Sequence, residues 1–181
     1  WTGDGGEVLH WGVSLLAFMF GAMLSGFLVK QSTLQLGRHY GVALLLESTL
    51  LFAAVPFLHE ANSAGLWLAA MAAGLQNGMA STYSGAVFRT THVSGMFTDL
   101  GIYLGQRLRG LEVDTLRIRV CLLVIGTFAL GGALGAWAFA LLGERAILLP
   151  AVLTGLAGAG YTAYCLHIVR AVAGPRSGGQ H

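Results

Sequence analysis

Polar and ionisable side chains gather in one stretch of this sequence, residues 74 to 101, which reads GLQNGMASTYSGAVFRTTHVSGMFTDLG. The segments on either side of it are apolar enough to enter a lipid bilayer. An ionisable side chain at the centre of a bilayer costs about 2.5–3.5 kcal/mol on the insertion scale, so such groups tend to face a cavity or another helix. We therefore expect the binding site for a substrate or an ion in this stretch. Its candidate residues are Gln76, Asn77, Arg89, Thr90, Thr91, His92, Ser94, Thr98 and Asp99.

Arg89 and the polar residues after it fit two interpretations. In one, Arg89 stands at the mouth of a cavity and binds an anion or pairs with Asp99, and a helix that begins near Thr91 adds N–H groups that favour an anion. In the other, Arg89 lies at the membrane interface and extends its guanidinium to lipid phosphates. The hydroxyl groups and the imidazole of His92 beside the cation favour the first interpretation.

Asp99 is the acid of this stretch, with apolar residues on both sides of it. It could couple transport to H⁺ or Na⁺, or it could lie on the surface of an interfacial helix and complement Arg107 through solvent. Gln76 and Asn77 also fit two roles, because amides in membrane helices commonly form interhelical hydrogen bonds and can also contact a substrate. We expect the cationic, acidic and amide groups of the stretch to converge on one polar cavity near a leaflet boundary.

Glu47 is the most isolated acid inside an apolar segment of the chain. A bare carboxylate is costly there, so Glu47 should be protonated, paired with an arginine or histidine, or in contact with a polar cavity. It is a second possible coupling site.

Catalytic and metal-binding patterns are absent from the sequence. Ser94, His92 and Asp99 lack the strand-turn-helix context of a hydrolase nucleophile, and no metal-ligand spacing of His, Cys and Glu occurs. Cys121 and Cys165 lie in apolar runs and are expected to be small buried hydrophobes. We predict no catalytic residue, no metal site and no cofactor, and the sequence leaves open whether the protein is an enzyme.

The composition is that of an integral membrane protein. Of 181 residues, 55% are hydrophobic and 10% are charged. The net charge of +2 is too small and too scattered to predict a nucleic-acid partner. A helix needs about 20 residues to cross a bilayer, and five stretches are long enough. They are Trp11–Val29, Tyr40–Leu58, Ala64–Ala80, Ile118–Leu142 and Ala146–Val172.

A sixth segment, Val93–Leu108, is shorter and more polar than these five, and it predicts a half-helix, an interfacial helix or a broken span. Gly and hydroxyl residues between Ser81 and Gly105 predict non-ideal helix there. The fold class expected is therefore all-α, a polytopic membrane helix bundle of five spans plus a broken or re-entrant segment.

Positive charge predicts the orientation of the spans. Lysine and arginine concentrate in the loop after the first stretch, in residues 107–119 and in the C-terminal tail, and five crossings place these three regions on one side. Cytoplasmic loops carry such an excess, so the C-terminus is expected in the cytoplasm.

A weak internal repeat relates the first and fourth stretches. FMFGAMLS at residues 18–25 matches FALGGALG at residues 128–135, which predicts helix contacts at Gly21, Ser25, Gly131 and Gly135. The match suggests one domain that holds the larger part of a 3+3 inverted repeat, in which two groups of three spans cross the membrane with opposite topology. Residues 1–63 would hold the last two spans of a first repeat whose start lies upstream of Trp1, and residues 64–181 the second repeat.

Gly74-Leu-Gln-Asn77, followed by residues 89–101 (RTTHVSGMFTDLG), resembles the second-half signature of the YoaK-like bacterial membrane proteins, which have no settled function. The resemblance implies a two-repeat membrane fold and no particular substrate. In that family the first repeat ends in a Thr-Gly-Asn type motif, which has no counterpart in this chain and suggests a truncated protein.

Together these patterns predict a small-solute or ion transporter of the bacterial inner membrane. The alternative is a non-catalytic structural or accessory subunit of a larger membrane complex. The expected partners are the lipid bilayer, an unidentified small solute or ion, and either further copies of the chain or a larger membrane complex.

Overall fold

The computed structural model describes residues 5–28, 38–83 and 93–172, which form helices and short turns without a strand. The all-α fold class is therefore confirmed. The helices are α1 (Gly5–Leu28), α2 (Arg38–His59), α3 (Ser63–Tyr83), α4 (Val93–Leu108), α5 (Thr115–Leu142), the 3₁₀ helix η1 (Gly143–Ile147) and α6 (Leu148–Val172).

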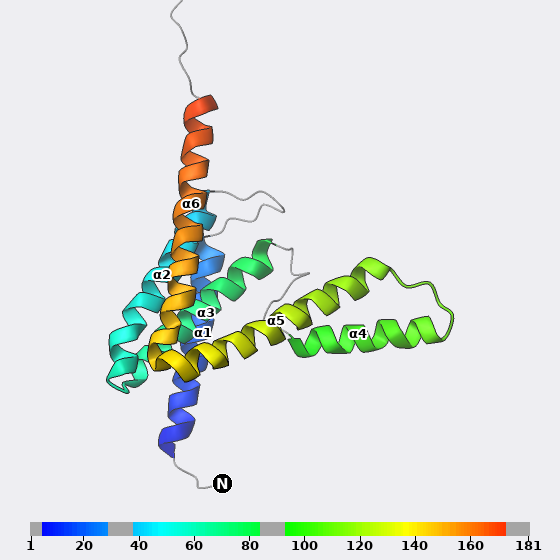
Figure 1. Ribbon diagram of the computed structural model, residues 1–181, viewed down its shortest axis with the longest axis horizontal. Helices are drawn as coiled ribbons and strands as arrows, with labels where there is room; N and C mark the ends of the chain where they lie inside the picture. The colour runs from blue at the N-terminus through cyan, green and yellow to red at the C-terminus, as the bar shows by residue number, and fades with distance from the viewer. Residues whose placement is uncertain (1–4, 29–37, 84–92, 173–181) are drawn as a thin grey trace, which may run out of the picture.

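The helices form a four-helix body and a hairpin that extends from it (Figure 1). In the body, α1 packs on α3, α3 on α2, and α2 on α6. The hairpin consists of α4 and α5. Among the described helices, α4 contacts α5 and no helix of the body. α5 reaches the body at η1, where the chain turns sharply into α6 (Figure 1).

Small residues set the contact between α1 and α3. A Cβ atom built at Gly21 would overlap the Met71 carbonyl oxygen, and one built at Gly74 would overlap the carbonyl oxygen of Phe18. Ser25, fully buried, lies against Gly78 in the same contact. Close backbone approach is how helices associate in lipid, where apolar burial gives no advantage.

The contact between α2 and α6 is built in the same way. A Cβ atom at Gly158 would lie 3.0 Å from the Leu44 Cβ atom, and one at Gly155 would lie 2.7 Å from the Ser48 hydroxyl oxygen. That hydroxyl donates a hydrogen bond of 2.7 Å to the carbonyl oxygen of Ala151. The buried bond between the two helices fixes their relative position.

We predict that Ser48→Ala lowers the free energy of unfolding by about 1 kcal/mol, because it removes this buried interhelical bond. Thermal unfolding in detergent measures the effect. Thr49→Ala is the matched control, because Thr49 is exposed and donates to Leu45 of its own helix. Equal stability of the two variants would show that the Ser48 bond contributes nothing.

Three stretches have the length and hydropathy of membrane spans: Gly6–Leu28, His39–His59 and Thr115–Ile168. The last has 54 residues, more than twice the roughly 20 of one crossing, and it contains α5 and most of α6. α3 falls outside the three because Gln76 and Asn77 lower its hydropathy. The membrane-span character of the chain is confirmed, and the count of five crossings stays a prediction.

The shorter sixth segment predicted at Val93–Leu108 is α4, with the same bounds. α3 ends at Tyr83, inside the range expected to be non-ideal, and residues 84–92 lie outside the described residues.

Candidate functional site

Glu47 is enclosed at the centre of the body. It lies on the same face of α2 as Ala43 and Leu51, one helical turn before and after it. Ala43 packs with Leu75 and Met79 of α3, and Leu51 packs with Ala72 of α3 and Ala151 of α6. The side chain of Glu47 is only 3% exposed. The glutamate therefore lies where α2 meets its neighbouring helices.

The Glu47 carboxyl group has an unsatisfied oxygen in this position. Its Oε2 atom is buried, and among the described residues it has neither a hydrogen-bond partner nor a basic side chain within ion-pair distance. An unsatisfied buried polar group costs about 1–3 kcal/mol, and more if it is charged. The fold therefore maintains an unfavourable acid inside a membrane-span helix, which is typical of a functional group.

In the part of the chain that the structure describes, three further buried polar atoms lack a hydrogen-bond partner: Ser25 Oγ, Trp67 Nε1 and Asn77 Oδ1. They belong to α1 and α3. Most buried polar atoms in proteins are hydrogen-bonded, so this group marks the α1–α3 side of the body as unusually polar for its burial.

A second polar site lies between the two helices of the hairpin. Asp99 lines a cavity of about 270 Å³ together with Met96 and Tyr103 of α4 and Arg117 and Cys121 of α5. Met96 and Cys121 are buried and form its apolar floor with Val124 nearby. We name this cavity the hairpin cleft.

Arg117 is held at one end of the hairpin cleft. Arg117 of α5 and Tyr103 of α4 line the cavity from opposite helices. The Arg117 Nε atom lies 4.0 Å from the carboxylate of Asp114, and both side chains are more than half exposed. Asp114 also caps α5, because its Oδ1 atom accepts a hydrogen bond of 2.9 Å from the Leu116 N–H group. The sequence interpretation missed Tyr103, Arg117 and Cys121, although the spacing of four residues from Asp99 to Tyr103 and from Arg117 to Cys121 puts each pair on one helix face.

Residues 1–160 match the protein family described as "Protein of unknown function (DUF1275)". The chain belongs to this family. No curated protein and no solved structure matches the chain. The match covers α1 to α5, η1 and the first half of α6, so Glu47 and the hairpin cleft both lie in the part shared with the family.

The predicted site residues of this DUF1275 member lie in two separate places. Gln76, exposed, and Asn77, half-buried, are on α3 of the body. Ser94, Thr98 and the half-buried Asp99 are on α4, which does not contact α3. Arg89, Thr90, Thr91 and His92 lie outside the described residues. The described residues thus do not bring Asp99 to the two amides, because the hairpin extends away from the body.

The hydroxyl groups of α4 are used within the helix itself. Thr98 donates a hydrogen bond of 3.0 Å to the carbonyl oxygen of Ser94, and both residues are exposed. Of the residues predicted on α4, Asp99 is the one that lines a cavity.

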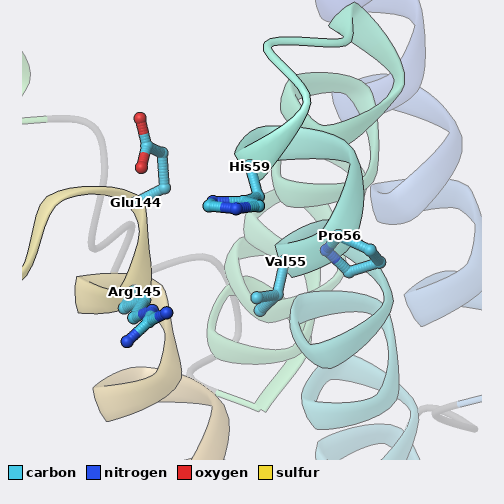
Figure 2. Close-up of a pocket in the computed structure, with 5 residues that line it drawn as sticks. All are labelled: Val55, Pro56, His59, Glu144 and Arg145. Atoms are coloured by element: carbon cyan, nitrogen blue, oxygen red, sulfur yellow. The ribbon is translucent and has the colours of Figure 1, made fainter.

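Another cavity, of about 240 Å³, lies where the end of α2 meets η1. Its lining consists of Val55, Pro56 and His59 of α2 and Glu144 and Arg145 of η1. Figure 2 shows the His59 ring pointing across from α2 toward the segment that carries Glu144 and Arg145. These three side chains form no ion pair within 4.0 Å. All three are exposed, so this cavity is an open recess at one end of the DUF1275 body.

The four predicted packing residues divide between the two parts of the fold. Gly21 and Ser25 lie in the α1–α3 contact. Gly131 and Gly135 are on the exposed surface of α5, and no described atom of another residue lies within 4 Å of a Cβ atom built at either. Small residues permit a close contact, but the described part of the chain supplies no helix to make it.

Proposed function

We propose that this DUF1275 member is a transporter of a small solute or ion in the bacterial inner membrane, with Glu47 as its coupling group. The observation that carries the proposal is the buried Glu47 carboxyl group with an oxygen left unsatisfied, inside a helix of membrane-span length. Intramembrane acids of this kind commonly relay protons or mark ion pathways.

The surroundings of Glu47 suggest how such coupling works. Enclosed by apolar neighbours, the group is stable only in its neutral form, because a buried carboxylate loses its hydration and the described residues offer it no cationic partner. It releases the proton when a movement of α2 relative to α3 or α6 admits water or a cation. Proton binding and helix position are thereby linked, which is the requirement for a coupled carrier.

The inverted repeat is part of the same proposal and agrees with the YoaK-like resemblance. The internal match aligns Gly21 and Ser25 of α1 with Gly131 and Gly135 of α5, so α1 and α5 are equivalent helices of the two repeats. Since α1 packs on α3, an inverted repeat would pack the counterpart of α3 on α5 in the same way. α2 and α6 occupy equivalent positions in the two repeats, and they pack on each other in the structure. Substrate sites of inverted-repeat transporters lie near the repeat interface, and Glu47 directly precedes Ser48, which bonds to Ala151 of α6.

Uptake into proteoliposomes tests the proposed activity. A screen of radiolabelled amino acids, organic acids and monovalent cations, with an acidic exterior, should find at least one that enters faster than into protein-free vesicles. A protonophore should abolish its accumulation. If correctly folded protein transports none of them with or without a pH gradient, the accessory-subunit alternative is favoured.

We predict that the loop between α4 and α5 faces the cytoplasm, because basic residues concentrate there. Leu111 is 52% exposed in this loop and is a suitable position for a single cysteine, in a chain that lacks Cys121 and Cys165. An impermeant maleimide should leave Leu111→Cys unmodified in intact cells and modify it after lysis. Glu144→Cys, at the other end of α5, is the control and should react in intact cells. Reaction of Leu111→Cys in intact cells would reverse the proposed topology.

The accessory-subunit function is the second candidate, and the surface of α5 favours it. Large apolar side chains such as Trp137 (65% exposed) and Phe139 (59% exposed) project from a helix that lies outside the body. A larger membrane complex could cover this surface. Under this alternative the intramembrane acid can be neutralised without loss of the cellular phenotype.

A further inference from the structure

The hairpin cleft presents two opposite charges that are not paired with each other. Asp99 of α4 and Arg117 of α5 both line it, yet their charged atoms are more than 4.0 Å apart. Opposite charges around a small cavity usually form an ion pair unless the geometry keeps them apart. In this hairpin the geometry does so.

The register of the two antiparallel helices explains the separation. Met96 of α4 packs with Cys121 and Val124 of α5. Because the two helices run antiparallel, Tyr103 then lies near the level of Arg117, and both residues line the cleft. Asp99 is one turn before Tyr103, which displaces it by about 6 Å along the helix axis. At that level lies Cys121 of α5, which lines the same cavity. The carboxylate therefore lies toward one end of the cleft and the guanidinium toward the other.

We propose that the hairpin cleft binds a small zwitterion that carries a primary ammonium group and an anionic group, with the ammonium beside Asp99 and the anion beside Arg117. A simple cation would satisfy Asp99 and leave Arg117 without a partner in the cleft, and a simple anion would do the reverse. A dipolar molecule satisfies both ends. A cavity of about 270 Å³ is below the range of about 300–1,000 Å³ typical of drug-sized ligands, so the ligand is small.

The contacts of Arg117 leave it available to the anion. Its approach to Asp114 is at the 4.0 Å limit of an ion pair and is exposed, and such pairs contribute little. The planar guanidinium carries five donors in a fork, so it can bind a carboxylate or phosphate with two N–H groups. This site is separate from Glu47, and its occupancy does not depend on transport.

Cys121 is a reporter inside the hairpin cleft, because it lines the cavity and is only 4% exposed. The test uses the full chain with Cys165→Ser, in phosphatidylcholine nanodiscs, and follows alkylation of Cys121 by N-ethylmaleimide. The probes are L-alanine, propionate, which lacks the ammonium, and ethylamine, which lacks the carboxylate. At about ten times its Kd, alanine should slow alkylation roughly tenfold, because few sites remain empty. Propionate and ethylamine should have no such effect.

Two variants and a lipid arm complete the test. Asp99→Asn and Arg117→Gln should each lose the protection, and Arg119→Gln, exposed on α5 but outside the cleft lining, should keep it.

The phosphatidylethanolamine headgroup also carries a primary ammonium group and an anionic group. Slow alkylation in phosphatidylethanolamine nanodiscs without alanine would identify a lipid as the zwitterion, and protection by alanine in phosphatidylcholine would identify a free solute. The proposal is overturned if neither alanine nor phosphatidylethanolamine slows alkylation, or if propionate or ethylamine alone slows it as much as alanine does. It is also overturned if both cleft variants remain protected.

Discussion

Gly21→Leu should prevent α1 from packing on α3 and strongly destabilise the protein. The position has no room for a side chain, because even a Cβ atom would overlap the Met71 carbonyl oxygen and lie 2.9 Å from the Leu75 nitrogen. Overpacking a tight core costs about 1–3 kcal/mol, and a clash with backbone atoms cannot be relieved by a rotamer change, so the loss should reach at least the upper end of that range. Thermal unfolding and size-exclusion chromatography in detergent measure it.

Gly26→Leu is the matched control for this prediction. Gly26 lies on the same helix, is exposed, and has no atom of another residue within 4 Å of a built Cβ atom. Leucine also has a higher helix propensity than glycine, by about 0.8–1 kcal/mol, so this variant should be as stable as the native chain or slightly more. Native-like unfolding of Gly21→Leu would mean that α1 and α3 do not cross as described.

Glu47→Gln should reduce proton-driven uptake to the level of protein-free vesicles while the protein remains folded. Glutamine keeps the size and polarity of the side chain but cannot give up a proton. No described ion pair involves Glu47, so the substitution removes no charge partner, and stability should change by no more than about 1–2 kcal/mol. Uptake and thermal unfolding measured on the same purified protein separate loss of coupling from loss of fold.

Glu60→Gln controls for the removal of one negative charge. Glu60 is exposed in the turn after α2, away from the buried interfaces, and its variant should transport at the native rate. Native uptake by Glu47→Gln would remove the coupling role of Glu47 and favour the accessory-subunit function.

The features that depend on local sequence were predictable. Hydropathy and length located the helices, including the bounds of the short α4, because a helix satisfies its own backbone and needs only a suitable run of residues. The burial of Gly21 and Ser25 in a helix contact followed from small residues at a spacing of four. The isolation of Glu47 was visible because few charges interrupt the apolar runs.

The features that depend on which helices meet were not predictable from the sequence. The same small-residue pattern occurs at Gly131 and Gly135, but the described chain has no helix against them. The site stretch was expected to form one cavity, whereas α4 packs on α5 and carries Asp99 away from Gln76 and Asn77. Arg117 joined the site through the register of the hairpin, which no local pattern encodes.

The central claim is that Glu47 is a neutral, enclosed carboxyl group that still exchanges its proton with water. Infrared spectroscopy of the protein in nanodiscs measures this directly, because a protonated carboxyl has its own C=O stretch and shifts to lower frequency when deuterium replaces the proton. The native protein should show a carboxylic acid band that Glu47→Gln lacks, and the band should shift after transfer to D₂O. Absence of that band, or a band that stays unshifted in D₂O while the protein remains folded, would contradict the account.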